Sequence, residues 1–165
     1  MHKFIGKKNK LSIRYLTESA IIASIYVLFT IIFAPISYGL FQVRISEALT
    51  VLPAYTKAAI PGLFVGCLIA NVIGGNGLPD IIFGSLSTLI AAFLSYKMPK
   101  RYLVPLPPVL INALVIGCVL SCVLNIPIHI AFFWVGIGQF IACYGLGYLL
   151  MIQLDKYKDK LFKNQ

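Results

Sequence analysis

The segment FQVRISEALTVLPAYTKAAIPG, residues 41–62, places three charged residues, Arg44, Glu47 and Lys57, inside an otherwise apolar part of the sequence. Long apolar runs flank the segment on both sides. One uncompensated charge at the centre of a membrane-spanning helix costs about 2.5–3.5 kcal/mol on insertion scales. We therefore expect each of these charges either to belong to a site or to lie at the membrane surface.

The composition is that of an integral membrane protein. The chain has 165 residues, of which 59% are hydrophobic and only 12% are charged, and its mean hydropathy is +0.90. A soluble domain of this length leaves too much of its surface in water to hide so many apolar side chains. We predict a single all-α integral membrane domain over residues 1–165.

Apolar runs separated by turn residues predict six helices. Crossing a hydrocarbon core of about 30 Å takes about 20 helical residues. The second and third segments are shorter than this and contain Pro53 and Pro61, so we expect them to be steep, broken or partly interfacial. The six predicted segments are 16–37, 45–57, 58–74, 78–96, 104–124 and 129–151.

The basic residues orient this bundle. Lys and Arg are enriched in cytoplasmic loops of membrane proteins, and a topology with both termini in the cytoplasm places every Lys and Arg except Arg44 on that side. Lys57 is then a cytoplasmic anchor. The net charge of +9 reflects this topology and does not indicate nucleic-acid binding. The first segment lacks a small-x-small cleavage site, so we expect it to be retained as a helix.

The remaining polar residues gather at the outer end of the predicted bundle. Ionisable residues within or at the edge of a membrane are candidates for a functional site, and aromatic rings beside them can stack on a planar ligand. The candidate substrate-binding residues are Tyr38, Gln42, Arg44, Glu47, Asn71, Asn76, Asp80, Phe83 and His129.

Several of these residues also have an ordinary structural interpretation. Arg44 and Glu47 are spaced i, i+3 and could pair on a helix at the membrane surface. Asp80 could stabilise a helix N-terminus, and His129 could cap a helix or contact headgroups. The aromatic residues could form an interfacial belt. Whether Glu47 or Asp80 contacts the ligand stays open at this point.

The sequence predicts no catalytic centre, cofactor or metal site. All four cysteines lie in apolar segments and are interpreted as packing residues, although Cys118 and Cys122 are spaced i, i+4 and could form a thiol pair. The glycine-rich run GGNGLPD, residues 74–80, lacks the GxxxxGK[ST] pattern of a phosphate-binding loop. An enzyme would need a metal cluster or a nucleophile with a base, so we expect the chain not to be an enzyme.

The stretch 38–96 resembles the QueT family, through the motifs VRISEALT, AIPGLFVGCLIAN and DIIFGSLSTL. The resemblance implies a six-helix substrate-binding S component of an energy-coupling factor (ECF) importer in a bacterial cell membrane. It implies that the cargo is a small planar base, 7-cyano- or 7-aminomethyl-7-deazaguanine. The implied partners are an ECF transmembrane subunit and two cytoplasmic ATPase subunits.

Related S components dock on the transmembrane subunit through an Ala-xxx-Ala face of their first helix. The nearest match in this chain is Ala20 with Ser24, and Ala23 lies beside them. The main alternative function is a stand-alone facilitator or secondary carrier. Such carriers often contain inverted repeats, and we find no convincing internal repeat in this sequence.

Overall fold

The computed structural model describes residues 5–38, 42–75 and 77–161. Within these ranges every regular element is a helix, which confirms the predicted all-α class. The α-helices are α1 (Ile5–Ile32), α2 (Ala34–Ser37), α3 (Ala59–Gly74), α4 (Ser85–Lys97), α5 (Leu106–Leu124), α6 (Ile128–Phe140) and α7 (Tyr148–Leu161). Two 3₁₀ segments, η1 (Ile45–Ala54) and η3 (Arg101–Leu103), and two π-helical segments, η2 (Asp80–Gly84) and η4 (Ile141–Gly147), connect or extend them.

Four stretches among the described residues are long and apolar enough to cross a membrane. They are Ile13–Ile32, Asp80–Lys97, Arg101–Leu124 and Ile128–Tyr157. Two further apolar helices, Ile45–Ala54 and Ala59–Gly74, are shorter. These are the segments that the sequence predicted to be short.

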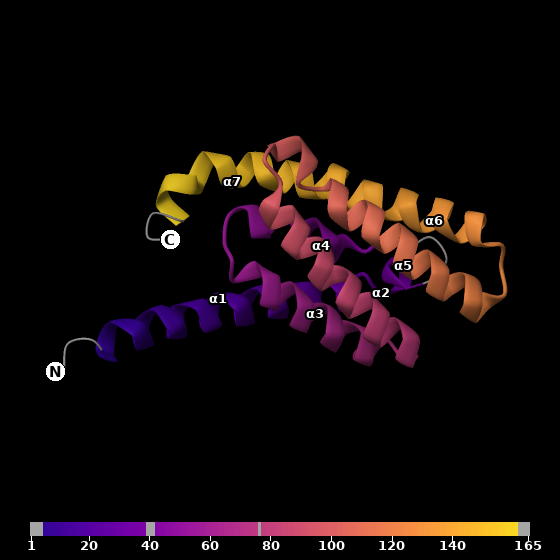
Figure 1. The fold of residues 1–165 in the computed structure, drawn as a ribbon, viewed down its shortest axis with the longest axis horizontal. Helices are drawn as coiled ribbons and strands as arrows, with labels where there is room; N and C mark the ends of the chain where they lie inside the picture. Colours follow the sequence, from indigo (N-terminus) through magenta and orange to yellow (C-terminus); the bar gives the residue numbers. More distant parts are fainter. Residues whose placement is uncertain (1–4, 39–41, 76, 162–165) are drawn as a thin grey trace.

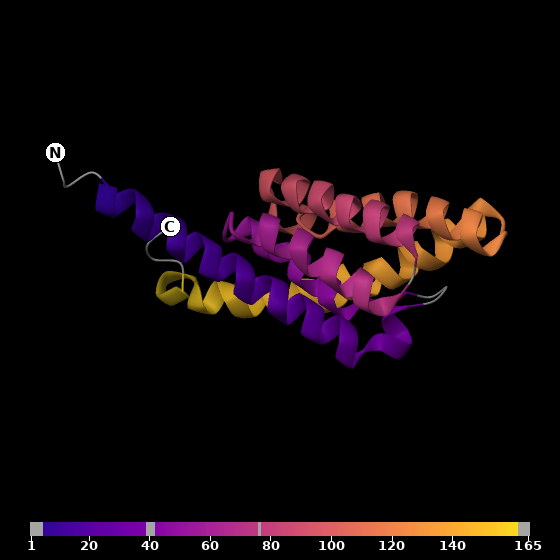
Figure 2. The ribbon, with the colours of Figure 1, turned by 90° about the horizontal axis from the view of Figure 1, so that it is seen from below.

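The long helices run side by side along the molecule (Figures 1 and 2). The beginning of α1 and the end of α7 lie at the same end of the bundle, together with the η1–α3 and α4–α5 connections (Figure 1). We call this the basic end, because it carries Arg14, Lys57, Lys97, Lys100, Arg101 and Lys156. We call the opposite end, where the α3–α4 and α5–α6 connections lie, the far end.

The second apolar segment differs from the α-helix that the sequence predicted over 45–57. Ile45–Ala54 forms a 3₁₀ helix of 10 residues with Pro53 inside it. A 3₁₀ helix rises about 2.0 Å per residue, so these residues extend over about 20 Å instead of about 15 Å. η1 contacts α1, α3, α4, η4 and α7, and most of its side chains are buried. The segment therefore lies at the centre of the bundle.

Glycines bring α1 and α3 into close contact. A Cβ atom built on Gly62 would lie 2.7 Å from the Ser19 carbonyl oxygen, and one built on Gly66 would lie 2.9 Å from Tyr26 Cβ and 3.0 Å from the Ala23 carbonyl oxygen. Gly62 and Gly66 form a small-xxx-small pair of the kind that lets membrane helices approach each other. This contact places Tyr26 of α1 deep in the bundle, where its side chain is fully buried.

We expect Gly66→Ala to destabilise the protein by about 1–3 kcal/mol, because the new methyl group forces α1 and α3 apart. Without a steric clash, alanine would stabilise the helix by about 1 kcal/mol relative to glycine. A loss of stability would therefore show that the two helices are too close to accommodate the methyl group. Gly145→Ala is the control, since no atom lies within 4 Å of a Cβ built there. Unfolding in detergent measures both variants, and equal stabilities would contradict the close α1–α3 contact.

Candidate functional site

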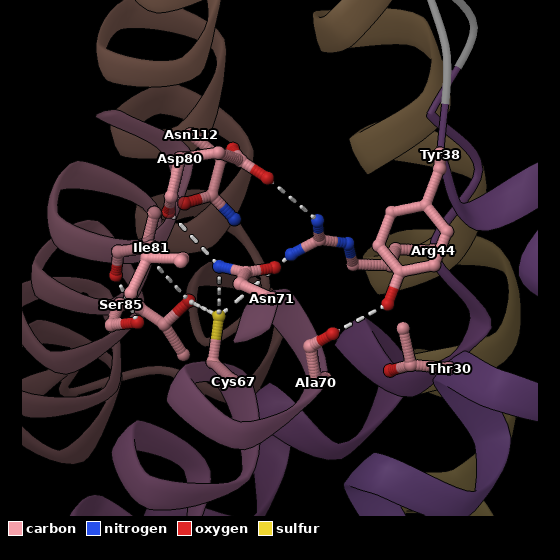
Figure 3. Close-up of polar contacts among 12 residues, drawn as sticks. Thr30, Tyr38, Arg44, Cys67, Ala70, Asn71, Asp80, Ile81, Ser85 and Asn112 are labelled. Atoms are coloured by element: carbon pink, nitrogen blue, oxygen red, sulfur yellow. Dashed lines mark hydrogen bonds and ion pairs between the residues drawn. The ribbon is translucent and has the colours of Figure 1, made fainter. Parts of the chain in front are cut away.

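Arg44 and Asp80 meet at the far end of the bundle. Arg44 directly precedes η1, and Asp80 is the first residue of η2. Arg44 Nη2 lies 3.5 Å from Asp80 Oδ2, and the exposed fractions of the two side chains are only 5% and 6%. The guanidinium carbon lies 5.5 Å from the centre of the Tyr38 ring. Figure 3 shows the Arg44 side chain between this ring and the polar groups of Asn71 and Asp80.

Asn71 and Cys67, one turn apart on α3, form the floor of this cluster (Figure 3). Asn71 Nδ2 donates a hydrogen bond of 3.0 Å to the backbone carbonyl of Asp80. Cys67 Sγ accepts weak hydrogen bonds from Arg44 Nη1 at 3.7 Å, Asn71 Nδ2 at 3.5 Å and Thr88 Oγ1 at 3.3 Å. The sequence interpretation of Cys67 as a packing residue missed these contacts.

Three buried polar atoms of this cluster have no hydrogen-bond partner within the described part of the chain. They are Nε and Nη2 of Arg44 and Oδ1 of Asn71. Asn71 is fully buried and Arg44 is 4% exposed. A buried polar atom without a partner costs about 1–3 kcal/mol, more when it is charged, and native proteins contain few such atoms. The cluster therefore offers two donor atoms and one acceptor atom to a ligand.

Glu47 lies next to the Arg44 cluster but makes its side-chain hydrogen bonds with other residues. Its Oε1 accepts a hydrogen bond of 2.6 Å from the Tyr26 hydroxyl, and its Oε2 accepts one of 3.3 Å from Asn112 Nδ2. Asn112 in turn contacts Gln139 Oε1 at 3.1 Å and accepts a hydrogen bond from Ser87 at 2.8 Å. This inner network joins α1, η1, α4, α5 and α6. Both carboxylate oxygens of Glu47 are engaged inside the protein.

Sequence reasoning missed Tyr26, Asn112 and Gln139, although a signal was present for two of them. Asn112 is the only amide side chain of the apolar helix α5, and Gln139, at the end of α6, lies inside the apolar stretch Ile128–Tyr157. Polar residues at such positions are rare and need partners within the bundle. The alternative interpretation, in which Arg44 pairs with Glu47 at i, i+3, is not what the structure has, because the carboxylate paired with Arg44 is Asp80.

Other predicted site residues lie elsewhere. Phe83 and His129 are exposed, so the structure does not bury them with Arg44. A Cβ atom on Gly84 would lie 2.8 Å from Asn71 Nδ2, so this side of the helix faces the cluster, and the preceding residue, Phe83, points outward with 51% of its surface exposed. Asn76 lies outside the described residues.

Gln42 is buried near the start of η1 and has a φ of 25°. Its carbonyl oxygen accepts a hydrogen bond of 3.0 Å from the Arg44 backbone N–H. Positive φ is uncommon for residues other than glycine, and strained backbone often occurs at functional sites. This tight turn sets the direction in which the Arg44 side chain leaves the backbone.

Only two of the three residues expected to contact a partner are exposed. Ala20 and Ser24 are exposed on α1. Ala23 is only 7% exposed, because it packs against Gly66 of α3. Cys118 and Cys122 are exposed free thiols. In the described ranges no three His, Cys, Asp or Glu residues lie close enough together to hold a metal ion.

The comparisons with known proteins agree with the resemblance found in the sequence. The QueT transporter family matches residues 16–156. The queuosine precursor transporter QueT of Lactococcus lactis subsp. cremoris is 35% identical over 85 residues, which are 50% of this chain and 50% of that protein. No solved structure matches the chain. Membership of a transporter family agrees with the expectation that the chain is not an enzyme. The family match covers most of the sequence, so this chain is a membrane protein that belongs to the QueT transporter family.

Proposed function

We propose that the chain is the substrate-capturing S component of an ECF-type importer and that it binds a 7-deazaguanine precursor of queuosine at the Arg44 cluster. Family membership supports the transport function, and the name of the Lactococcus relative supports the class of cargo. The unpartnered Arg44 and Asn71 atoms are the observation on which the binding site rests.

The lactam edge of a 7-deazaguanine matches these atoms. It presents a carbonyl oxygen beside a ring N–H, so Arg44 Nε or Nη2 can donate to the oxygen while Asn71 Oδ1 accepts from the N–H. A guanine would offer Arg44 two acceptors, the oxygen and N7, but a 7-deaza base has carbon in place of N7. The deaza base can therefore accept one hydrogen bond from Arg44 at its carbonyl oxygen and donate one to Asn71 from its ring N–H. The Tyr38 ring, already beside the guanidinium, is placed to contact the planar base.

Asp80 completes the proposed site. Its carboxylate pairs with the Arg44 guanidinium, and in this binding mode it would also contact an aminomethyl substituent on the base. A phosphate group would be repelled by the same carboxylate. The site is therefore expected to accept a neutral or cationic base and to reject nucleotides.

The membrane arrangement supports capture from outside. Lys and Arg are enriched on the cytoplasmic side of membrane proteins, so the basic end is assigned to the cytoplasm and the Arg44 cluster to the outer side. The two short apolar helices, η1 and α3, would complete a bundle of six membrane segments with the four longer stretches. The chain would then need the ECF transmembrane subunit and two ATPase subunits to release its cargo inside the cell.

Import in cells that cannot make queuosine precursors tests this proposal, with queuosine in tRNA as the readout. We expect import only when the chain is expressed together with an ECF module. Ala20→Leu should retain binding and lose import, because added bulk on the exposed side of α1 prevents close helix docking.

Ile21→Leu is the matched control, since Ile21 is the next residue of α1 and is 53% exposed. We expect this variant to import normally. Import by the chain alone, in cells or in proteoliposomes, would contradict the S-component assignment and favour a stand-alone carrier.

A further inference from the structure

A cavity of about 420 Å³ lies at the basic end, far from the Arg44 cluster. Its walls come from α1, from the end of η1 with its connection to α3, and from the end of α4. The residues that matter for its chemistry are Arg14, Tyr15, Glu18, Tyr55, Lys57 and Tyr96. The size is that of a small-molecule site, and neither the proposed capture of a base nor the inner Glu47 network uses it.

The cavity has one cation that is not neutralised by a carboxylate. Arg14 Nε donates to Glu18 Oε1 at 2.9 Å, so these two charges compensate each other. Lys57 makes no ion pair with any residue that the structure describes. Its Nζ lies 5.5 Å from the centre of the Tyr96 ring. The net charge of the lining favours an occupant with a single negative charge.

The cavity lies at the ends of two apolar stretches, because its lining includes Arg14 near the start of Ile13–Ile32 and Tyr96 near the end of Asp80–Lys97. Tyrosines line it, and tyrosine is enriched where a membrane meets water. Two of these tyrosines, Tyr15 of α1 and Tyr96 of α4, are 41% and 39% exposed and offer ring surface beside the cavity. An occupant that puts an anionic group beside Lys57 can therefore lay hydrocarbon chains against α1. A soluble anion would leave these side chains uncovered.

We propose that this cavity binds the headgroup of a monoanionic phospholipid, with its phosphodiester beside Lys57 and its acyl chains along α1. Basic pockets between membrane helices are known to hold anionic headgroups. Tyr15 donates a hydrogen bond to the Lys57 carbonyl, and Thr56 donates one to Glu18. These contacts join α1 to the η1–α3 connection, so a lipid here would hold the two walls together. The proposal does not depend on the identity of the transported substrate.

Native mass spectrometry of the purified full chain tests this site. The protein is incubated with equal amounts of phosphatidylglycerol, phosphatidylethanolamine and phosphatidylcholine, and the retained lipids are counted. We expect the wild type to retain phosphatidylglycerol about tenfold better than phosphatidylcholine, and Lys57→Gln to remove this preference, because a charge-assisted contact is lost. Glu18→Gln should raise retention of phosphatidylglycerol, since it removes the carboxylate of the lining.

Lys97→Gln is the matched control, because Lys97 is also at the basic end and lies 4.4 Å from the ring centre of Phe93, but it does not line the cavity. We expect it to keep the preference for phosphatidylglycerol.

The proposal is wrong if the three lipids are retained equally, if Lys97→Gln acts like Lys57→Gln, or if retention does not rise in Glu18→Gln. Displacement of the lipid by soluble glycerol phosphate would instead identify a site for a soluble anion. Loss of a copurifying protein in Lys57→Gln, with lipid retention unchanged, would identify a protein-docking site.

Discussion

Arg44→Gln is expected to lower the affinity for a 7-deazaguanine precursor by about 10- to 150-fold, the equivalent of about 1.5–3 kcal/mol for a charged hydrogen bond. The variant removes Nε and Nη2, the two donor atoms that have no hydrogen-bond partner within the described residues. Isothermal titration with the purified chain measures the change. An unchanged affinity would show that Arg44 does not contact the substrate.

Two further variants separate binding from folding. Arg44→Gln leaves the Asp80 carboxylate buried without its cation, which destabilises a protein by itself. The double variant Arg44→Gln with Asp80→Asn removes both charges, so we expect it to fold but still to bind weakly. Arg101→Gln makes the same change at the basic end, where Arg101 pairs with Asp155, and should bind like the wild type.

Glu47→Ala is expected to have the second large effect, a loss of about 2–5 kcal/mol of stability. The substitution leaves the Tyr26 hydroxyl without its acceptor and removes one acceptor from Asn112, and each buried unpaired group costs about 1–3 kcal/mol. The cavity left by the side chain adds to this cost. The temperature midpoint of unfolding in detergent measures the loss.

Glu18→Ala is the control for this change. Glu18 pairs with Arg14 on a surface where the two side chains are 27% and 44% exposed, and exposed ion pairs contribute about 0–1 kcal/mol. If both variants are equally stable, the Glu47 network does not hold the bundle together. If Glu47→Ala is stable but fails to bind the substrate, Glu47 is a ligand contact, as the sequence first suggested.

The sequence predicted the helical class and the positions of the apolar segments, because hydrophobic length and proline placement act locally. It did not predict that Ile45–Ala54 is a 3₁₀ helix at the centre of the bundle. That geometry depends on the five elements packed around η1. These elements come from the whole length of the chain, so the sequence of the segment alone does not reveal them. The π-helical segment at Asp80–Gly84 has no distinct sequence pattern either.

The candidate site shows the same division between local and non-local information. Arg44, Asn71 and Asp80 are unusual residues for a membrane segment, so the sequence alone could select them. Their pairing could not be read from spacing, because the partner of Arg44 lies in η2 and the partners of Glu47 lie in α1 and α5. The sequence made Glu47 a candidate ligand contact because it is a carboxylate inside an apolar stretch, and the structure adds that Tyr26 and Asn112 donate hydrogen bonds to it.

Competition binding to the purified chain, without partner subunits, tests the central claim most directly. The ligands are 7-cyano-7-deazaguanine, 7-aminomethyl-7-deazaguanine, guanine, GMP, thiamine and biotin. We predict that the two deazaguanines bind, that 7-aminomethyl-7-deazaguanine binds more tightly than guanine because only its aminomethyl group can pair with Asp80, and that GMP does not compete because a phosphate is costly to bury beside a site that holds a carboxylate. Tight binding of thiamine or biotin, with no binding of the deazaguanines, would contradict both the assigned cargo and the proposed chemistry of Arg44 and Asn71.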